Sequence, residues 1–152
     1  MPKIELSQVE ADRLIGLEKH YLQSEPVFFP NLGEKVCLEL KSNDRKEIFL
    51  LDIIRGRIDV KKITYQNRAR TTIILLRLDL IGSKHRNPDG KEVECPHIHR
   101  YKEGYGDKWA YELGSDEFEG AFTNPQDLFI TIDEFMDYCN IITKPAIQLS
   151  IT

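Results

Sequence analysis

The chain has 152 residues, of which 30% are charged and 41% hydrophobic, and its formal net charge is −4. This length suits one domain, which buries roughly 68 to 70% of the surface of its unfolded chain and so folds without a disulfide or metal staple. Three widely spaced cysteines argue against a disulfide framework and favour a reducing compartment. Charges interrupt the N-terminal segment and the apolar runs, which argues against a signal peptide and a membrane span. We therefore expect a single cytoplasmic domain over residues 1–152 with no membrane partner.

The charges are unevenly distributed along the chain. Residues 41–108 hold 16 Lys and Arg against 10 Asp and Glu, whereas the remaining residues hold 5 against 15. A basic middle in an acidic protein can direct an electrostatic field toward an anionic ligand such as nucleic acid. Strands that face water also carry Lys and Arg, so the asymmetry fits an ordinary solvated sheet equally well.

The first expected element is a helix that begins after Ser7 and ends before Ser24. Ser7 and Glu10 have the spacing of a capping box. The helix would carry one apolar stripe, formed by Leu14, Leu17 and Tyr21. The segment that follows, "SEPVFFPNLGEK", contains two prolines and a glycine, which predict an irregular connection.

The next part of the chain has the patterns of β-strands. "KVCLELKS" alternates apolar and polar residues, and "EIFLLDIIRG" is apolar on both faces apart from Asp52, as a central strand would be. "RIDVKKITYQ" and "TTIILLRLDLIG" continue the series, and a last strand is expected over "KWAYEL". The connections are short enough for hairpins only, which predicts an antiparallel meander.

A second helix is expected within "NPQDLFITIDEFMDYCNII". Thr131 and Glu134 have the spacing of another capping box. The apolar stripe of this helix would consist of Ile132, Phe135, Met136 and Cys139. The sequence therefore predicts an α+β domain with an antiparallel β-meander of five or six strands, an N-terminal helix and a C-terminal helix.

The segment "CPHIHRY" places Cys95, His97, His99 and Tyr101 on one face if it is a strand. The turn "NPDG" joins it to the strand that ends near Ile81. A plain four-residue loop would set both histidines among leucines. A one-residue bulge at Gly90 would instead pair His97 with Ile81, His99 with Asp79 and Tyr101 with Arg77. We favour the bulged register, because it keeps Ile98 with the leucines and gathers the polar side chains on the other face.

Three interpretations of this polar patch stay open. The first is a metal site formed by Cys95, His97 and His99, which His85 or Asp79 could approach, although the compact spacing of a zinc motif is absent. The second is metal-independent acid–base chemistry on a phosphodiester without a cofactor. In this interpretation His97 and His99 are acid and base, Asp79 orients them, Arg77 and Arg100 hold the phosphate, and Tyr101 is an auxiliary donor. The third is a row of structural cross-strand pairs.

A second group of residues suits a nucleic-acid surface. Basic side chains interleaved with an aromatic ring can follow a phosphate backbone and stack on a base. The expected members are Arg55, Arg57, Lys61, Lys62, Tyr65, Arg68, Arg70, Arg100 and Lys102. A solvated hairpin with charged tips would carry the same residues. The loop "YKEGYGDKW" has the composition of a segment that could close over a ligand.

The words "LLRLD", "HRNPDG", "PHIHRY" and "EGYGDKWA" resemble an uncharacterised bacterial domain family met on phages, plasmids and defence loci, over about residues 5–140. An Arg-rich strand pair followed by a His-x-His strand also looks like compact toxin ribonucleases of the TumE and RelE kind. That likeness implies RNA as the substrate, in preference to DNA, and a cognate antitoxin as a partner. Toxins of that kind are shorter and net basic, so the acidic flanks of this chain depart from the pattern.

Two function classes follow from these observations. One is a toxin-like ribonuclease of a mobile element. The other is a non-enzymatic inhibitor that acts on a nucleic-acid-binding defence complex of the host, as anti-CRISPR proteins do. An enzyme requires His97 and His99, whereas an inhibitor depends on its acidic surface.

Overall fold

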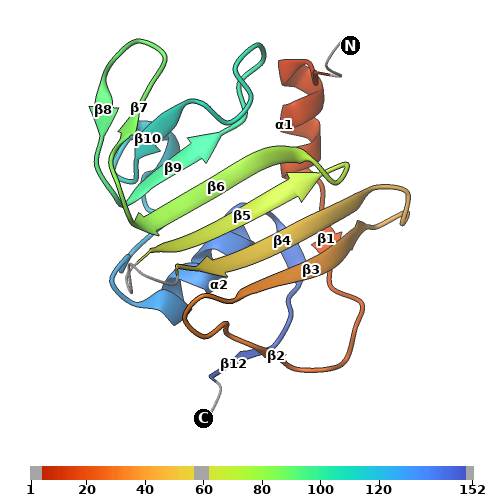
Figure 1. The fold of residues 1–152 in the computed structure, drawn as a ribbon. Coiled ribbons are helices and arrows are strands. Elements are labelled where there is room, and N and C mark those ends of the chain that lie inside the picture. Colours follow the sequence, from red (N-terminus) through yellow and green to blue (C-terminus); the bar gives the residue numbers. More distant parts are fainter. Residues whose placement is uncertain (1–4, 57–61, 150–152) are drawn as a thin grey trace.

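The computed structural model describes residues 5–56 and 62–149, which form one large sheet, two helices and several short elements (Figure 1). The helices are α1 (Gln8–Gly16) and α2 (Leu128–Tyr138), and a short 3₁₀-helix, η1 (Asp116–Phe118), precedes α2. The main sheet contains β1 (Lys19–His20), β3 (Lys35–Ser42), β4 (Ile48–Arg55), β5 (Ile63–Ala69), β6 (Ile73–Ile81), β9 (His97–Arg100), β10 (Ala110–Glu112) and β11 (Ile141–Thr143). Two small sheets pair β2 (Val27–Phe28) with β12 (Ile147–Gln148) and β7 (His85–Arg86) with β8 (Glu92–Val93). Neither α1 nor α2 combines the length and the apolar character needed to cross a bilayer, and the same holds for every helix within residues 5–56 and 62–149.

The strand order of the main sheet is β10-β9-β6-β5-β4-β3-β1-β11. The run from β3 to β10 is antiparallel, which confirms the predicted α+β class and meander. The sheet has eight strands where five or six were expected, because β1 and β11 extend it beyond β3 and pair with each other in parallel. Both added strands are only two or three residues long, too short for an alternating pattern to reveal.

The two faces of the sheet differ in polarity. Helix α2 lies against one face, where the rings of Tyr65 and Phe135 are 6.2 Å apart within a core of buried aliphatic and aromatic side chains (Figure 1). On the other face, neighbouring strands carry polar side chains: Asp52, Gln66, Arg68, Arg77 and Asp79. This alternation follows from the two-residue period of a strand, and it leaves the second face for polar contacts and chemistry.

The first helix is shorter than predicted. Ser7 accepts a hydrogen bond from the Glu10 amide as the cap requires, but the Glu10 carboxylate pairs with Arg13 and Arg70 instead of the Ser7 backbone. The helix ends at Gly16, so the expected continuation to residue 23 was wrong. Gly16 is a weak helix former, and the chain beyond it gains backbone hydrogen bonds by entering the sheet as β1.

The second helix has its predicted apolar face but a different start. Ile132, Phe135, Met136 and Cys139 are all buried, which confirms the stripe. The N-cap is Asp127, whose carboxylate accepts from the amides of residues 129 and 130, so the capping box predicted at Thr131 and Glu134 was wrong. An Asp side chain caps a helix as well as Ser or Thr does, and this one lies a full turn earlier. The helix is followed by β11 and β12, so it is not the last element.

The connection between β6 and β9 contains its own small hairpin. The Gly90 amide donates to the Asn87 carbonyl at 2.8 Å, and Gly90 has a φ of +88°, so the left-handed residue lies where the turn required it. The bulged register holds within β7 and β8, where His85 pairs with Val93. It does not continue into β6 and β9. Pro96 has no N–H to extend the ladder, and two more residues lie between the paired parts of β6 and β7 than between those of β8 and β9.

The predicted pairing of β6 with β9 was therefore wrong by two residues. Asp79 lies opposite His97, not His99, and Arg77 lies opposite His99, not Tyr101. Because side chains alternate with a period of two, a shift of two residues leaves every side chain on its expected face. The polar patch forms as expected, with different direct neighbours.

Candidate functional site

Two adjacent strands bring the central residues of the site together. Strand β6 supplies Arg77 and Asp79, and β9 supplies His97 and His99, all on the face opposite α2. His97 is 1% exposed and His99 is 0% exposed, so both rings are buried beneath the surface of this face. On the reverse side of β9, Ile98 packs opposite Leu78 in the core, which fixes the orientation of both histidines.

Both imidazole rings direct the same nitrogen to one carboxylate oxygen. Oδ2 of Asp79 is 3.1 Å from Nε2 of His97 and 3.2 Å from Nε2 of His99. The other nitrogens face backbone carbonyls: Nδ1 of His99 is 2.7 Å from the Asp107 oxygen, and Nδ1 of His97 is 3.2 Å from the Glu94 oxygen. For His99, Nε2 accepts from Nη2 of Arg77, so Nδ1 carries the proton and donates to the Asp107 carbonyl. For His97, Nδ1 faces a carbonyl and Nε2 faces a carboxylate, and both groups only accept, so either nitrogen can be the donor.

Arg77 occupies the gap between these acceptors. Its Nη2 donates to Nε2 of His99 at 3.0 Å, and its Nε donates to Oδ2 of Asp79 at 3.3 Å. Its Nη1 donates to the carboxylate of Asp107 at 2.9 Å. The positive charge of the guanidinium thus lies between the negative charges of Asp79 and Asp107.

Two pKa values in the cluster are shifted. The pKa of Asp79 shifts against the effect of burial, whereas the pKa of His99 shifts in the same direction as burial. Burial alone would raise the pKa of Asp79, but its contacts with His97 and His99, the charge of Arg77 and the hydroxyl of Thr64 outweigh burial and hold that pKa far below its usual range. Burial lowers the pKa of His99, and the nearby guanidinium acts in the same direction against the pull of Asp79. The cluster therefore combines a carboxylate with a neutral imidazole near neutral pH.

A small pocket opens onto this cluster. It has a volume of about 170 Å³, and Asp79 and His97 form part of its wall together with Arg77 and Thr64. Its rim carries further side chains that can charge or ionise: Lys62, Lys84, His85 and Cys95. His99 is absent from the lining. Only one of the two paired imidazoles thus faces a ligand in the pocket.

Asp79, His97 and His99 satisfy the spacing of a metal site. One ligand atom from each lies within 4.8 Å of the others. Two ligands bound at about 2.0–2.1 Å to a tetrahedral ion lie somewhat more than 3 Å apart, which the 3.1 and 3.2 Å separations match. Cys95 is not part of this set, because its sulfur lies 3.7 Å from Nδ1 of His97, on the ring edge turned away from Asp79. Burial raises the pKa of Cys95 to about 11 in the metal-free protein. The group that meets the spacing contains Asp79 in place of the Cys95 of the predicted trio.

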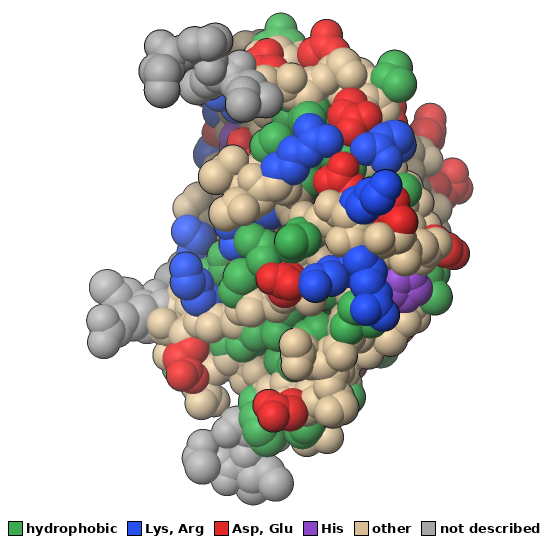
Figure 2. Space-filling view, turned by 90° about the vertical axis from the view of Figure 1, so that its right-hand side faces the viewer, with side chains coloured by type: hydrophobic (Ala, Val, Ile, Leu, Met, Phe, Trp, Pro, Cys, Tyr) green, Lys and Arg blue, Asp and Glu red, His purple; other side chains and the backbone are tan. Residues whose placement is uncertain are grey.

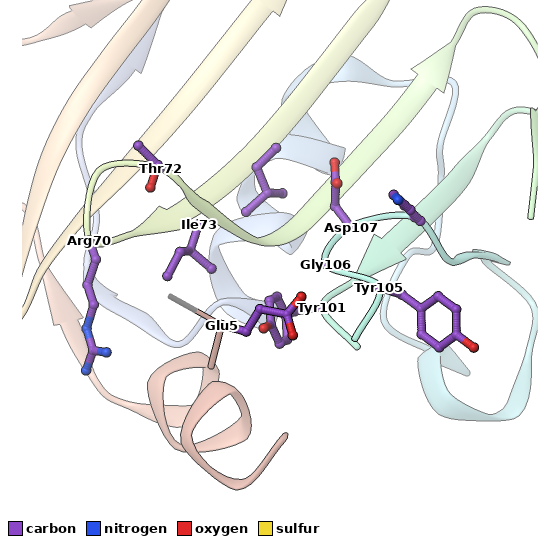
Figure 3. Close-up of a pocket in the computed structure, with 10 residues that line it drawn as sticks. Glu5, Arg70, Thr72, Ile73, Tyr101, Tyr105, Gly106 and Asp107 are labelled. Carbon is purple, nitrogen blue, oxygen red and sulfur yellow. The ribbon is translucent and has the colours of Figure 1, made fainter. Parts of the chain in front are cut away.

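Tyr101 and Arg100 do not join the histidines. The Tyr101 hydroxyl donates to the Leu6 carbonyl at 2.8 Å and accepts from the Leu6 amide, which ties the start of the chain to β9. The ring borders a separate hollow of about 700 Å³, beside Glu5 and Ile73 (Figure 3). Arg100 points to the other side of β9 and pairs with Asp12 and Glu117.

The structure describes seven of the nine residues predicted for nucleic acid, and their side chains have different surroundings. Tyr65 is fully buried and its hydroxyl donates to the Leu128 carbonyl, so its ring cannot stack on a ligand. Four cations are engaged by local partners: Arg55 with Phe29, Arg68 with Asp52, Arg70 with Glu10 and Glu47, and Lys102 with Trp109. Figure 2 shows Lys and Arg interleaved with Asp and Glu on the side that carries α1. Arg57 and Lys61 lie outside the described residues, and Lys62 is the one member of the set that lines the histidine pocket.

The sequence reasoning missed two residues that hold the site. Thr64 lies opposite Asp79 on β5 and donates to its Oδ1 at 2.7 Å. Asp107 binds His99 through its carbonyl and Arg77 through its carboxylate. Pairing "KITYQ" with "LLRLDL" would have identified Thr64. Asp107 lies in the loop whose two glycines had suggested closure over a ligand, and no local pattern indicated its contact with β9.

Comparison with known proteins identifies a family but no activity. A model described as "Family of unknown function (DUF6978)" matches residues 6–141, which confirms the expected resemblance to an uncharacterised domain family. No curated protein and no solved structure matches the chain. The likeness to toxin ribonucleases therefore has no support from these comparisons.

Proposed function

We propose a function, from the geometry of the site, for this chain, which belongs to DUF6978, a family of unknown function. The protein binds a divalent transition-metal ion at Asp79, His97 and His99 and uses it to hydrolyse a phosphoester. One observation carries the proposal. Both Nε2 atoms converge on one carboxylate oxygen while both Nδ1 atoms face backbone carbonyls. Histidines that bind metals have this arrangement, since the second hydrogen bond fixes the tautomer and the direction of the lone pair.

The ligand set favours a catalytic ion over a structural one. Two imidazoles and one carboxylate leave at least one coordination position for water or substrate, whereas structural zinc sites use four protein ligands. Imidazole and carboxylate suit Zn²⁺, Fe²⁺ and neighbouring ions of the first transition row. The open side of this site is the 170 Å³ pocket, so an ion there would meet a small ligand directly.

The proposal revises the expected chemistry of the two histidines. Metal-independent cleavage by the predicted pair needs His97 and His99 on opposite sides of the phosphorus, and His99 does not line the pocket. His97 and His99 would instead hold an ion, and such an ion would supply a water nucleophile by lowering the pKa of a bound water to near neutrality. Nucleic acid, RNA in particular, stays the proposed substrate, with Lys62 and Arg77 as the predicted basic residues that reach the pocket.

Isothermal titration of the chelator-treated protein with Zn²⁺ or Co²⁺ tests the binding step. We expect one ion per chain in the wild type. His97→Ala and His99→Ala should each weaken binding by more than about tenfold, since the loss of even an outer partner of a metal ligand costs 10- to 100-fold. His20→Ala is the matched control, because His20 lies on β1 and bonds to Thr143 and Asn43. Equal affinities in all four proteins would refute the site.

Incubation of the metal-loaded protein with total RNA tests the reaction. Cleavage should require the ion, stop with a chelator and disappear in His97→Ala. Intact RNA in the presence of bound metal would refute nucleic-acid hydrolysis while leaving the metal site in place.

A second proposal is a non-enzymatic inhibitor that docks on a nucleic-acid-binding defence complex. Outside residues 41–108 the chain has 15 acidic residues against 5 basic ones, and this negative charge supports the proposal. In that case charge reversal on the acidic segments abolishes binding to the complex, while His97→Ala leaves it unchanged.

A further inference from the structure

The pocket above the proposed metal site is balanced in charge while Arg77 occupies the cluster. Arg77 contacts the carboxylates of Asp79 and Asp107, and Lys84 pairs with Glu92 at 3.0 Å on the exposed rim. Lys62 adds one further positive charge to the lining. An anion entering this pocket therefore meets little net attraction before a metal ion is bound.

A metal ion and Arg77 compete for the same lone pair. Nε2 of His99 accepts from Nη2 of Arg77 at 3.0 Å, and one lone pair cannot serve a guanidinium and a metal at once. The ion would also repel a guanidinium 3.3 Å from Oδ2 of Asp79. Binding of the ion must consequently move Nη2 of Arg77 off His99.

The displaced guanidinium has a defined place to go. Its Nη1 is held by the carboxylate of Asp107, on the far side from Asp79, and Arg77 already lines the pocket. A guanidinium kept by Asp107 and released from His99 turns its remaining N–H groups toward the pocket. Guanidinium groups bind phosphate oxygens in pairs, so the pocket then offers the ion on one side and Arg77 on the other.

We propose, resting on the proposed metal site, that the pocket binds a phosphoryl group only after the metal ion, with Arg77 moving from His99 to the phosphoryl oxygens and Lys62 supplying additional charge. The substrate class is therefore a phosphate ester. Arg77 exchanges one acceptor for another, so the same side chain opposes metal binding and supports anion binding. The volume of about 170 Å³ accommodates a phosphoryl group but not a nucleotide, whose base would lie outside the pocket.

Arg77→Gln tests the exchange, because it should change two affinities in opposite directions. Removing a competing cation should strengthen Zn²⁺ binding by about tenfold, and removing the clamp should weaken inorganic phosphate binding to the Zn²⁺-loaded protein by at least about tenfold. Arg77→Lys keeps the charge but has a single nitrogen, so it should lower phosphate affinity with little change in Zn²⁺ affinity. Circular dichroism verifies that both variants are folded.

Lysine variants separate this inference from general electrostatics. Lys62→Met should lower the affinity of the Zn²⁺-loaded protein for inorganic phosphate by about threefold to tenfold, with a smaller effect on Zn²⁺ affinity than Arg77→Gln has. Lys91→Met is the matched control on the exposed turn between β7 and β8, and it should change neither affinity.

Each outcome decides between the proposals. Equal phosphate affinity with and without Zn²⁺, or unchanged phosphate affinity in Arg77→Gln, overturns the inference while the metal site stands. No Zn²⁺ binding by the wild type overturns the proposed function and the inference together.

Discussion

Asp79→Asn should destabilise the metal-free protein strongly, because this carboxylate holds three neighbours. It accepts from Thr64 at 2.7 Å and from Arg77 at 3.3 Å, it lies 3.1 Å from Nε2 of His97, and its side chain is only 17% exposed. Hydrogen bonds to a charged group contribute about 1.5–3 kcal/mol each, and an amide of the same shape retains part of this set. Arg77 also keeps its pairing with Asp107. We therefore expect the free energy of unfolding to fall by about 3 kcal/mol.

Urea unfolding of the chelator-treated protein at pH 7 measures this loss. In a chain of this length, about 3 kcal/mol corresponds to a decrease of roughly 6–12 °C in Tm. The pKa of Asp79 is lower in the folded than in the unfolded protein, so its stabilisation is complete above about pH 5 and decreases as the pH falls. The difference between wild type and Asp79→Asn should therefore shrink in acid.

Asp133→Asn is the control, since Asp133 forms an ion pair with Lys144 at 2.9 Å but is 57% exposed. It should cost less than about 0.5 kcal/mol. If Asp79→Asn were as stable as this control, Asp79 would not organise the cluster.

Two further predictions concern residues outside the site. Lys19 is fully buried and donates to three backbone carbonyls, so Lys19→Met should lower the free energy of unfolding by about 2–3 kcal/mol in urea titrations. Burial lowers the pKa of Lys19 to about 8 from 10.5, so the wild type should gain stability relative to Lys19→Met as the pH rises between these values. Tyr101→Phe leaves both backbone groups of Leu6 without their partner, so it should cost about 1–2 kcal/mol in the same assay. Its Zn²⁺ affinity should equal that of the wild type, and a large loss of affinity would restore Tyr101 to the site.

Much of the meander could be predicted because its strands have clear patterns. The run "KVCLELKS" coincides with β3, and Asp52 is the polar residue inside β4, which is otherwise apolar up to its last residue, Arg55. Strands β1 and β11 could not be predicted, because each gains its stability from pairing with distant segments and not from its own sequence. The length of α1 failed for the same reason, since β1 takes the residues that would have extended it.

The sequence could predict which side chains share the polar face, but not which of them contact one another. The leucines of β6 and Ile98 of β9 had to point to the core, which placed the two histidines with Asp79 and Arg77. The pairing itself depended on how the chain passes Pro96, which no local pattern reveals. The contact of Asp107 with His99 depends on the path of a loop eight residues away, so the donor geometry that supports a metal site emerged only from the fold.

Anomalous X-ray scattering from crystals grown with Zn²⁺ tests the central claim most directly. We predict a single strong peak within about 2.0–2.2 Å of Nε2 of His97, Nε2 of His99 and a carboxylate oxygen of Asp79. Nη2 of Arg77 should then no longer lie within hydrogen-bonding distance of His99. A peak bound by other residues, or no peak with Arg77 still donating to His99, would contradict the metal site.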